Sequence, residues 1–343
     1  MTKFGILISY INDNFVNFVV QRGIVNKKAC FLFPGQGAQY PGMGLDFLQW
    51  TQENSPESEI IRLFSLAKEV MGMDMAEVLA NSSPDHLKRT DVSQPAITLA
   101  NLSSALFLKE RGIEPLACAG FSLGEYTALV LGGVISLEDC IFLVNERGKA
   151  MQGAIDSISS GGGEAPGMAA VVGLNPEQVD TIISTRDWEL YGANYNSQRQ
   201  VVVSGTSAAL KEAEAVFKEA GARRYIILPV AGPYHSPFMK AAADAFASSL
   251  EKVAFKDPLI PLFSNVTGGQ ISSGAEAKAL ALRQIVESVK WTEVEGAIQK
   301  LSPPMIIEAG PGKVLQGLWK DTEDPTPCLA GGTLQDCLEI TQQ

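Results

Sequence analysis

The chain has 343 residues, 46% of them apolar and 19% charged, so it can bury a sizeable core in about two domains or in one domain with a large insertion. Its net charge of −11 disfavours nucleic acid as a partner, because an acidic surface repels a phosphate backbone. No apolar run approaches the roughly 18 residues that a membrane helix needs, so we expect no membrane partner either.

The five cysteines and two histidines are too few and too widely spaced for a metal site. No CxxC pair occurs, so we expect reduced thiols in a cytoplasmic protein, with Cys118 and Cys140 packed as small apolar side chains. Residues 1–28 have no convincing basic region or cleavage site. We therefore expect no secretion signal there and treat them as an N-terminal extension of unknown role.

The first part of the chain alternates apolar runs with helical spacing. Apolar runs at residues 29–33 and 116–120 predict buried strands that enter glycine-containing turns. Helical spacing occurs at 57–80, 91–110 and 124–131. Strands that alternate with helices predict an α/β fold with a mainly parallel sheet covered on both faces.

The pattern changes after a glycine-rich stretch at 159–163. Residues 161–227 predict the order β-α-β-β-α-β, which is typical of a ferredoxin-like unit. We predict that this unit is inserted into a discontinuous core formed by 29–160 and 228–343. The individual predictions are strands at 168–172, 201–205 and 224–229 and helices at 176–184 and 208–220 in the insertion, with core strands resuming at 259–263 and 305–308.

The sequence Gly120-Phe121-Ser122-Leu123-Gly124 fits G-x-S-x-G between a predicted strand and a predicted helix. A serine on such a turn has strained backbone angles, and the flanking glycines permit close approach of the chain. The helix N-terminus offers free N–H groups to a developing oxyanion. We predict that Ser122 is a nucleophile; the alternative is a Gly-Ser turn without chemistry.

A serine nucleophile needs a base, and two histidines are available. His86 lies in a polar stretch before a helix, which is typical of a solvated surface residue. His235 lies in a Gly/Pro-framed loop straight after an apolar strand, where catalytic groups of α/β folds usually lie. We therefore predict His235 as the base, against the alternative of a loop histidine with a structural role.

Two further features invite a functional interpretation. The glycine-rich stretch 33–44 is not a P-loop, and we predict that the backbone N–H of Gln36 faces the serine; the alternative is a simple turn. Arg147 follows an apolar helical stretch at 139–144 and is by default a solvated arginine. If it were buried, its guanidinium could hold a carboxylate on the acyl group in a bidentate fork.

Six motifs in this order resemble the malonyl-CoA:acyl-carrier-protein transacylase family of bacterial fatty acid synthesis, and also the acyltransferase domains of polyketide synthases. The resemblance covers about residues 29–320, nearly the whole chain. The motifs are Phe33-Pro34-Gly35-Gln36-Gly37-Ala38-Gln39, Ser93-Gln94-Pro95-Ala96, Gly120-Phe121-Ser122-Leu123-Gly124-Glu125-Tyr126, Arg147-Gly148, Tyr234-His235-Ser236-Pro237-Phe238-Met239 and Gly310-Pro311-Gly312-Lys313-Val314-Leu315.

The resemblance implies an α/β-hydrolase-like core with an inserted ferredoxin-like subdomain. It implies malonyl transfer from a coenzyme A thioester to the phosphopantetheine thiol of acyl carrier protein, without a cofactor. One position departs from the family: the residue before the serine is Phe121 and not histidine, which leaves the positioning of the substrate open but not the serine chemistry. By this resemblance, Ser122 accepts the acyl group, His235 is the base, and a carbonyl of Gln284 orients this base. The backbone N–H groups of Gln36 and Leu123 would form the oxyanion hole. Arg147 would pair with the malonyl carboxylate, and Tyr234 and Asn196 would contact the substrate.

Three alternatives stay open at this point. The chain could act in a polyketide pathway, it could be a serine hydrolase or thioesterase with an acidic triad member, or it could be a non-catalytic binding relative. An acidic carrier protein would need a local basic patch on this acidic chain. The candidates lie around the inserted unit, where a solvated helix face is an equally good interpretation: Lys211, Lys218, Arg223 and Arg224.

Overall fold

A computed structural model describes residues 27–161 and 165–342 of the chain. Its larger sheet has five strands in the order β7-β2-β1-β8-β9, and every neighbouring pair is parallel. The predicted N-terminal extension lies outside the described residues, except that Lys27 and Lys28 open β1. The strands are β1 (Lys27–Phe33), β2 (Ile113–Gly120), β7 (Leu262–Phe263), β8 (Ile306–Glu308) and β9 (Cys328–Ala330).

Strand β1 shows why this sheet is buried on both faces. Ala29, Phe31 and Phe33 belong to one apolar cluster, whereas Cys30 and Leu32 belong to another. Because successive side chains of a strand point to opposite faces, a continuous apolar run feeds two core layers at once. Helices α12 (Trp291–Gln299) and α13 (Val314–Asp321) cover one face.

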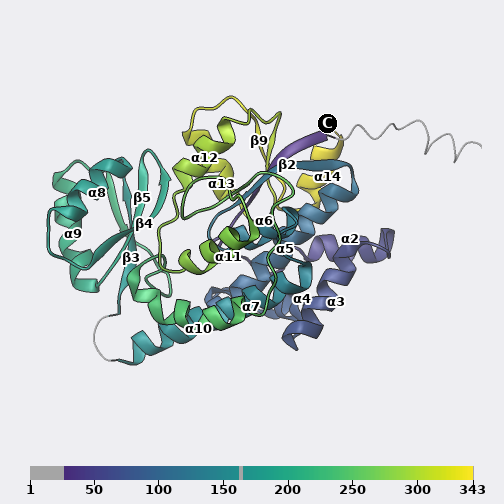
Figure 1. The fold of residues 1–343 in the computed structure, drawn as a ribbon, viewed down its shortest axis with the longest axis horizontal. Helices are drawn as coiled ribbons and strands as arrows, with labels where there is room; N and C mark the ends of the chain where they lie inside the picture. The colour runs from purple at the N-terminus through teal and green to yellow at the C-terminus, as the bar shows by residue number, and fades with distance from the viewer. Residues whose placement is uncertain (1–26, 162–164, 343) are drawn as a thin grey trace, which may run out of the picture.

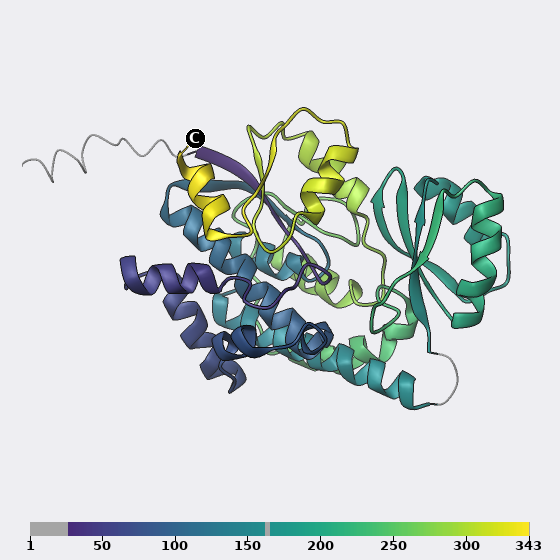
Figure 2. The ribbon, with the colours of Figure 1, turned by 180° about the vertical axis from the view of Figure 1, so that it is seen from behind.

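The other face carries most of the helices (Figure 1). Among them α7 and α10 pack side by side and run toward the smaller sheet (Figure 2). The helices of this layer are α2 (Leu45–Asn54), α3 (Glu59–Met71), α4 (Met75–Asn81), α5 (Thr90–Glu110), α6 (Gly124–Leu131), α7 (Leu137–Ser160), α10 (Lys240–Leu250), α11 (Gly274–Arg283) and α14 (Leu334–Gln342), with 3₁₀ turns η1 (His86–Lys88) and η2 (Pro237–Met239).

The smaller sheet has four antiparallel strands in the order β4-β5-β3-β6 and stands at one end of the molecule (Figure 1). With its two helices it follows the order β-α-β-β-α-β, so the predicted fold class, a parallel core with a ferredoxin-like unit, is confirmed. The exact domain boundaries stay a prediction. The elements are β3 (Gly167–Val172), α8 (Pro176–Ser184), β4 (Leu190–Ser197), β5 (Gln200–Gly205), α9 (Ser207–Glu219) and β6 (Arg224–Ile227).

Three local expectations were wrong. The helix expected at 57–80 breaks at Gly72, whose φ of 67° ends α3 before α4 begins. Only Leu262 and Phe263 of the expected strand 259–263 pair with the sheet, and Leu259 is 82% exposed. Helix α7 does not end before Arg147 but continues to Ser160, so this arginine lies within the helix.

All five cysteines are free; four are buried and Cys328 is half-buried. Burial raises the pKa of each thiol, to about 12 for Cys328 and for Cys337. They therefore pack as small, uncharged side chains, as expected for Cys118 and Cys140. Within the residues that the structure describes, no helix is both long enough and apolar enough to cross a bilayer.

Candidate active site

Ser122 lies on the turn between β2 and α6, at the carboxyl end of a central strand. Its φ is 50°, in the left-handed region that non-glycine residues rarely adopt. A Cβ on Gly120 would lie 1.9 Å from the carbonyl carbon of Gly124, and a Cβ on Gly124 would lie 2.0 Å from the carbonyl oxygen of Phe33. Both glycines are therefore required for the tight turn that presents the serine hydroxyl.

The serine hydroxyl meets the histidine that the sequence predicts. Ser122 Oγ lies 2.8 Å from His235 Nε2. His235 Nδ1 lies 2.8 Å from the carbonyl oxygen of Gln284 and 3.2 Å from that of Glu287. Because a carbonyl oxygen only accepts, Nδ1 carries the proton, and Nε2 presents its lone pair to the hydroxyl. This is the tautomer that a general base needs.

His235 is buried, and its pKa is lowered to about 4, first because burial disfavours the charged ring and second because the Arg147 cation repels a proton. The imidazole is therefore neutral at physiological pH. The groups that orient it are two backbone carbonyls, in place of the carboxylate of a hydrolase triad. His86, in contrast, is exposed on η1 and contacts Ser82 Oγ at 2.9 Å.

The loop that precedes Gln36 lies against the turn that carries Leu123. A Cβ on Gly35 would be 3.5 Å from the Leu123 nitrogen, so the loop that carries Gln36 packs against the start of α6. Within the described part of the chain, neither the Gln36 N–H nor the Leu123 N–H has a hydrogen-bond partner. Two unpartnered amides beside a serine hydroxyl can stabilise an oxyanion, with the positive end of the α6 dipole behind them.

Arg147 is fully buried, contrary to its default interpretation as a solvated arginine. Nη1 donates to Gln94 Oε1 at 2.9 Å, and Nη2 donates to Gln284 Oε1 at 3.1 Å, so both partners are neutral amides. Nε has no partner. Tyr126 is a further hydrogen-bond partner of the guanidinium, so two of the five N–H groups remain available, which is the number that a bidentate carboxylate needs.

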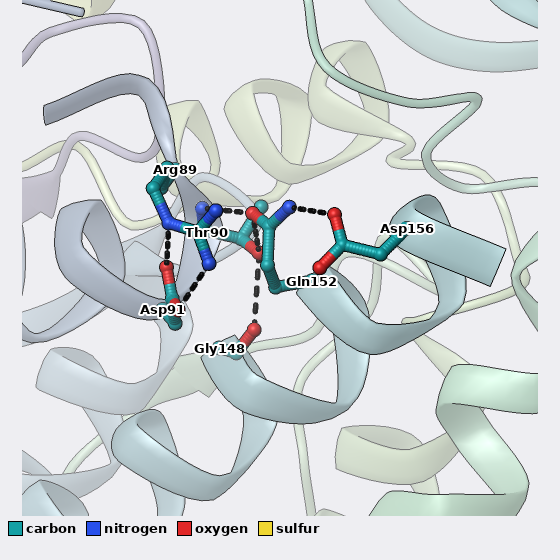
Figure 3. A network of polar contacts seen from close by, with 6 residues as sticks. All are labelled: Arg89, Thr90, Asp91, Gly148, Gln152 and Asp156. Carbon is teal, nitrogen blue, oxygen red and sulfur yellow. Dashed lines mark hydrogen bonds and ion pairs between the residues drawn. The ribbon is translucent and has the colours of Figure 1, made fainter. Parts of the chain in front are cut away.

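Helices α5 and α7 pack closely where Thr90 meets Gly148 and Gln152 (Figure 3). The Thr90 N–H donates to Gln152 Oε1 at 3.0 Å, and the Thr90 hydroxyl donates to the Gly148 carbonyl at 3.0 Å. A Cβ on Gly148 would lie 2.7 Å from the Thr90 carbonyl oxygen, so this crossing requires a glycine next to the arginine. The start of α5 thereby brings Gln94 within reach of Arg147.

Tyr234 and Asn196 have different surroundings. The Tyr234 hydroxyl is hydrogen-bonded to the Gln36 side chain, which places it beside the glycine-rich loop of the site. Burial raises the pKa of Tyr234 to about 12, so the hydroxyl stays protonated. Asn196 lies on β4, is only 8% exposed, and its Oδ1 has no partner. No contact joins Asn196 to Ser122, so its role as a substrate contact stays a prediction.

Asn265 was not predicted from the sequence; it follows β7 and is fully buried beside the serine turn. Glu125 was not predicted to have a role either; it is 1% exposed, and its carboxylate accepts the Asn265 N–H at 2.8 Å. Burial raises the pKa of Glu125 to about 7. Glu125 was visible as part of the serine motif, but no motif pointed to Asn265.

A cleft of about 630 Å³ opens beside His235, at the junction of the two sheets. Its walls come from the small sheet, from the end of α11 and from the loop before α12. Its charged lining is balanced, because Arg283 and Lys290 face Asp180 and Glu287, and Arg283 pairs with Glu287 at 2.7 Å. The rings of Tyr191 and Tyr195 give it apolar surface. A flexible thioester arm could reach the base through this cleft.

The family described as "Acyl transferase domain" matches residues 30–335. The chain belongs to this family. Acyl transferase relatives include a protein of Haemophilus influenzae that is 36% identical over 86% of this chain and 92% of its own length, and one of Bacillus subtilis that is 35% identical over 85% and 90%. Both are named malonyl CoA-acyl carrier protein transacylase.

Solved acyl transferase structures share the fold. A malonyl CoA-acyl carrier protein transacylase of Coxiella burnetii superposes with a TM-score of 0.83 at 29% identity, over 92% of this chain and 98% of that one. A malonyl-transacylase in complex with its type II PKS acyl-carrier protein gives a TM-score of 0.83 at 31% identity, over 92% and 99%. The resemblance found in the sequence is thus confirmed over nearly the whole chain.

Proposed function

We propose that this acyltransferase moves a malonyl group from malonyl-CoA to the phosphopantetheine thiol of acyl carrier protein, through a malonyl ester on Ser122, and so supplies fatty acid synthesis. The named relatives support this function, as does the arrangement of Ser122, His235 and Arg147. The single observation that carries the malonyl assignment is the buried guanidinium, which has neutral hydrogen-bond partners and an unpartnered Nε.

In the first half-reaction, His235 Nε2 takes the proton of the Ser122 hydroxyl while Oγ attacks the thioester carbonyl. The oxyanion that forms is stabilised by the N–H groups of Gln36 and Leu123. When the tetrahedral intermediate collapses, the C–S bond breaks and the imidazolium returns the proton to the departing coenzyme A sulfur. The products are free coenzyme A and malonyl-Ser122.

In the second half-reaction, His235 takes the proton of the carrier thiol and the thiolate attacks the malonyl ester. The C–O bond then breaks, the proton returns to Ser122 Oγ, and malonyl carrier protein leaves. The neutral partners of His235 favour transfer over hydrolysis, because an imidazole oriented by carbonyls is a weaker base toward water than one backed by a carboxylate. Burial and the Arg147 cation, not the two carbonyls, lower the pKa of His235 to about 4 and so weaken the base further.

Arg147 would select the acyl group. A carboxylate on the substrate compensates the buried positive charge of Arg147 and accepts hydrogen bonds from its free N–H groups. An acetyl group has no carboxylate, so it leaves the charge uncompensated and these N–H groups without acceptors. Burial lowers the pKa of Arg147, and the charge of Glu125 offsets only part of this shift; Glu125 forms no hydrogen bond with the guanidinium among the described contacts. The free N–H groups are thus the natural site of the malonyl carboxylate.

The coenzyme A thioester and the carrier arm would both enter through the cleft beside His235. Among the predicted docking residues, Arg223 and Arg224 are exposed at the free edge of the small sheet, whereas Lys218 pairs with Glu214 at 2.6 Å. This edge strand, β6, lies on the opposite side of the small sheet from β4, which lines the cleft, so the docking surface of the carrier stays a prediction. The proposed reaction needs no cofactor. The substrates and five unpaired cysteines fit a cytoplasmic location.

Intact mass measurement tests the proposal directly. After incubation with malonyl-CoA, the wild type should gain one malonyl group, which Ser122→Ala should not gain. Holo acyl carrier protein should then discharge the adduct and appear in malonylated form. Continuous release of coenzyme A without an adduct or a carrier would instead establish the hydrolase alternative. Use of carrier proteins from fatty acid and polyketide pathways in parallel would distinguish these two assignments.

A further inference from the structure

Both peptide groups of Ser122 are held by amide side chains from the C-terminal part of the chain. Asn265 Oδ1 accepts the Ser122 N–H at 2.5 Å, and Gln284 Nε2 donates to the Ser122 carbonyl at 3.1 Å. Asn265 Nδ2 also donates to the Gly120 carbonyl at 2.6 Å. One asparagine thus spans the turn, with one atom on the residue before Phe121 and the other on the residue after it.

The backbone N–H and carbonyl of Asn265 are also hydrogen-bonded. Its backbone N–H donates to Glu125 Oε2 at 2.8 Å, and its carbonyl accepts the Lys290 N–H at 2.8 Å. Glu125 lies on the first turn of α6, and its own N–H donates to the Ser122 carbonyl at 3.1 Å. Asn265 is 0% exposed, so these hydrogen bonds do not compete with water.

These hydrogen bonds hold the backbone of Ser122 in a conformation that is unfavourable by itself. A serine at φ 50° has to be held there by its surroundings, because left-handed non-glycine residues are costly. The amide of Asn265 supplies one donor and one acceptor at the required spacing, and an apolar side chain of the same size supplies neither. Without these bonds, the Gly120 carbonyl and the Ser122 N–H would be buried and unpartnered, and the turn would relax.

We propose that Asn265, held by Glu125, is a positioning residue that sets the angle of the serine turn and so aims Oγ at His235 Nε2. It touches neither the substrate nor the reacting atoms; it acts through the backbone of the nucleophile. This inference rests on the proposed role of Ser122 as the acylated residue.

The test is the rate of malonyl-enzyme formation at saturating malonyl-CoA, normalised to the active sites titrated by the burst of coenzyme A. Asn265→Leu removes both hydrogen bonds at similar volume, and Asn265→Ala removes them with a smaller side chain. We expect both to acylate between about tenfold and a hundredfold more slowly per active site, with little change in KM. Asn265→Asp keeps an acceptor for the Ser122 N–H and should be faster than either.

Ser264→Ala is the matched control. Ser264 is also fully buried and precedes Asn265, but its hydroxyl accepts only the Val266 N–H, at 3.1 Å. It should lose a similar amount of thermal stability and keep the wild-type acylation rate. A purely structural role for Asn265 would lower the melting temperature or the titrated fraction in all variants and leave the rate per active site unchanged; that result would overturn the proposal.

The two proposals fail in different ways. If Ser122→Ala still forms the adduct, Ser122 is not the nucleophile and the proposed function is wrong. If Ser122→Ala forms none but folded Asn265→Leu or Asn265→Ala acylates within about threefold of the wild type, only the positioning role is wrong. An Asn265→Asp variant no faster than Asn265→Leu would also contradict it. If one apolar variant fails to fold, the other decides.

Discussion

The parallel sheet supplies the nucleophile directly from a strand end, whereas the small antiparallel sheet supports the base through the segment that leaves its edge strand. Ser122 follows β2 on a strained turn with little freedom. His235 follows β6 in a loop whose Tyr234 carbonyl accepts the Ser204 hydroxyl at 2.7 Å. The 2.8 Å contact between Ser122 and His235 therefore joins the two sheets.

The small sheet also fixes the groups that orient the base. The N–H of Tyr195 on β4 donates to the Val289 carbonyl at 2.8 Å, and the Val289 N–H donates to the Ala193 carbonyl at 2.8 Å. This bridge anchors the segment that carries the carbonyls of Gln284 and Glu287. The chemistry of the core therefore depends on a unit that contributes no reacting atom from its own strands.

The largest effect is expected when the base that spans this junction is removed. His235→Ala should slow acylation by about a thousandfold or more, because within residues 27–161 and 165–342 only His235 Nε2 is hydrogen-bonded to the serine hydroxyl. The rate of the coenzyme A burst measures this step. His86→Ala is the matched control, since its exposed ring contacts only nearby polar groups, and it should be as fast as the wild type. A His235→Ala rate within tenfold of wild type would rule out the base assignment.

The next effect concerns the core alone. Arg147→Ala should lower kcat/KM for malonyl-CoA by about a hundredfold, the value of one or two charge-assisted hydrogen bonds, while acetyl-CoA becomes a better substrate. Competition between the two thioesters, read by mass, measures the selectivity. Arg186→Ala is the control, because this exposed arginine of the small unit pairs with Glu212 at 3.0 Å. Unchanged selectivity in Arg147→Ala would show that the carboxylate binds elsewhere.

The pH dependence sharpens the role of the junction. Because burial lowers the His235 pKa from 6.5 to about 4, acylation should stay level down to about pH 5 and fall tenfold per unit below pH 4. In the unfolded chain the ring takes up its proton near pH 6.5, so the free energy of unfolding should decrease as the pH falls from 6.5 toward 4. If the acylation rate instead fell to half its value near pH 6.5, the base would be solvated and not buried.

The smallest effect tests the link from the small sheet to the base. Ser204→Ala leaves the Tyr234 carbonyl without its donor, which should cost about 1 kcal/mol of stability and slow acylation a few-fold. Ser207→Ala is the control: it removes a hydroxyl of the same unit, bonded to the Ala165 carbonyl at 2.8 Å and away from the histidine. Equal acylation rates in both variants would show that the small sheet does not tune the base.

The nucleophile and base were predictable because each depends on local sequence. The glycines around Ser122 mark a turn that only small residues permit, and His235 stands in a loop framed by glycine and proline. The position of β4 could not be predicted in the same way. The order β-α-β-β-α-β of the inserted unit required a further strand, but Leu190–Ser197 has no simple alternation of apolar and polar residues that would locate it.

Long-range packing explains why the burial of Arg147 and the position of Asn265 could not be predicted from the sequence. Arg147 is buried because α7 continues past it and crosses α5 at Gly148, which no pattern near the arginine reveals. Asn265 is separated from Ser122 by 143 positions, and its neighbours form no recognisable spacing. Buried amides that bond to backbone carry no periodic signal, so their partners emerge only in the folded chain.

The burial of the cysteines has a practical consequence. Each acyl transfer from a coenzyme A thioester releases one free thiol. Because burial raises the pKa of all five protein thiols, they are almost wholly protonated at neutral pH, and four of them are also buried away from reagents, with Cys328 half-buried. A thiol-reactive dye can therefore follow coenzyme A release in real time against a low background from the enzyme itself, without replacement of any native cysteine.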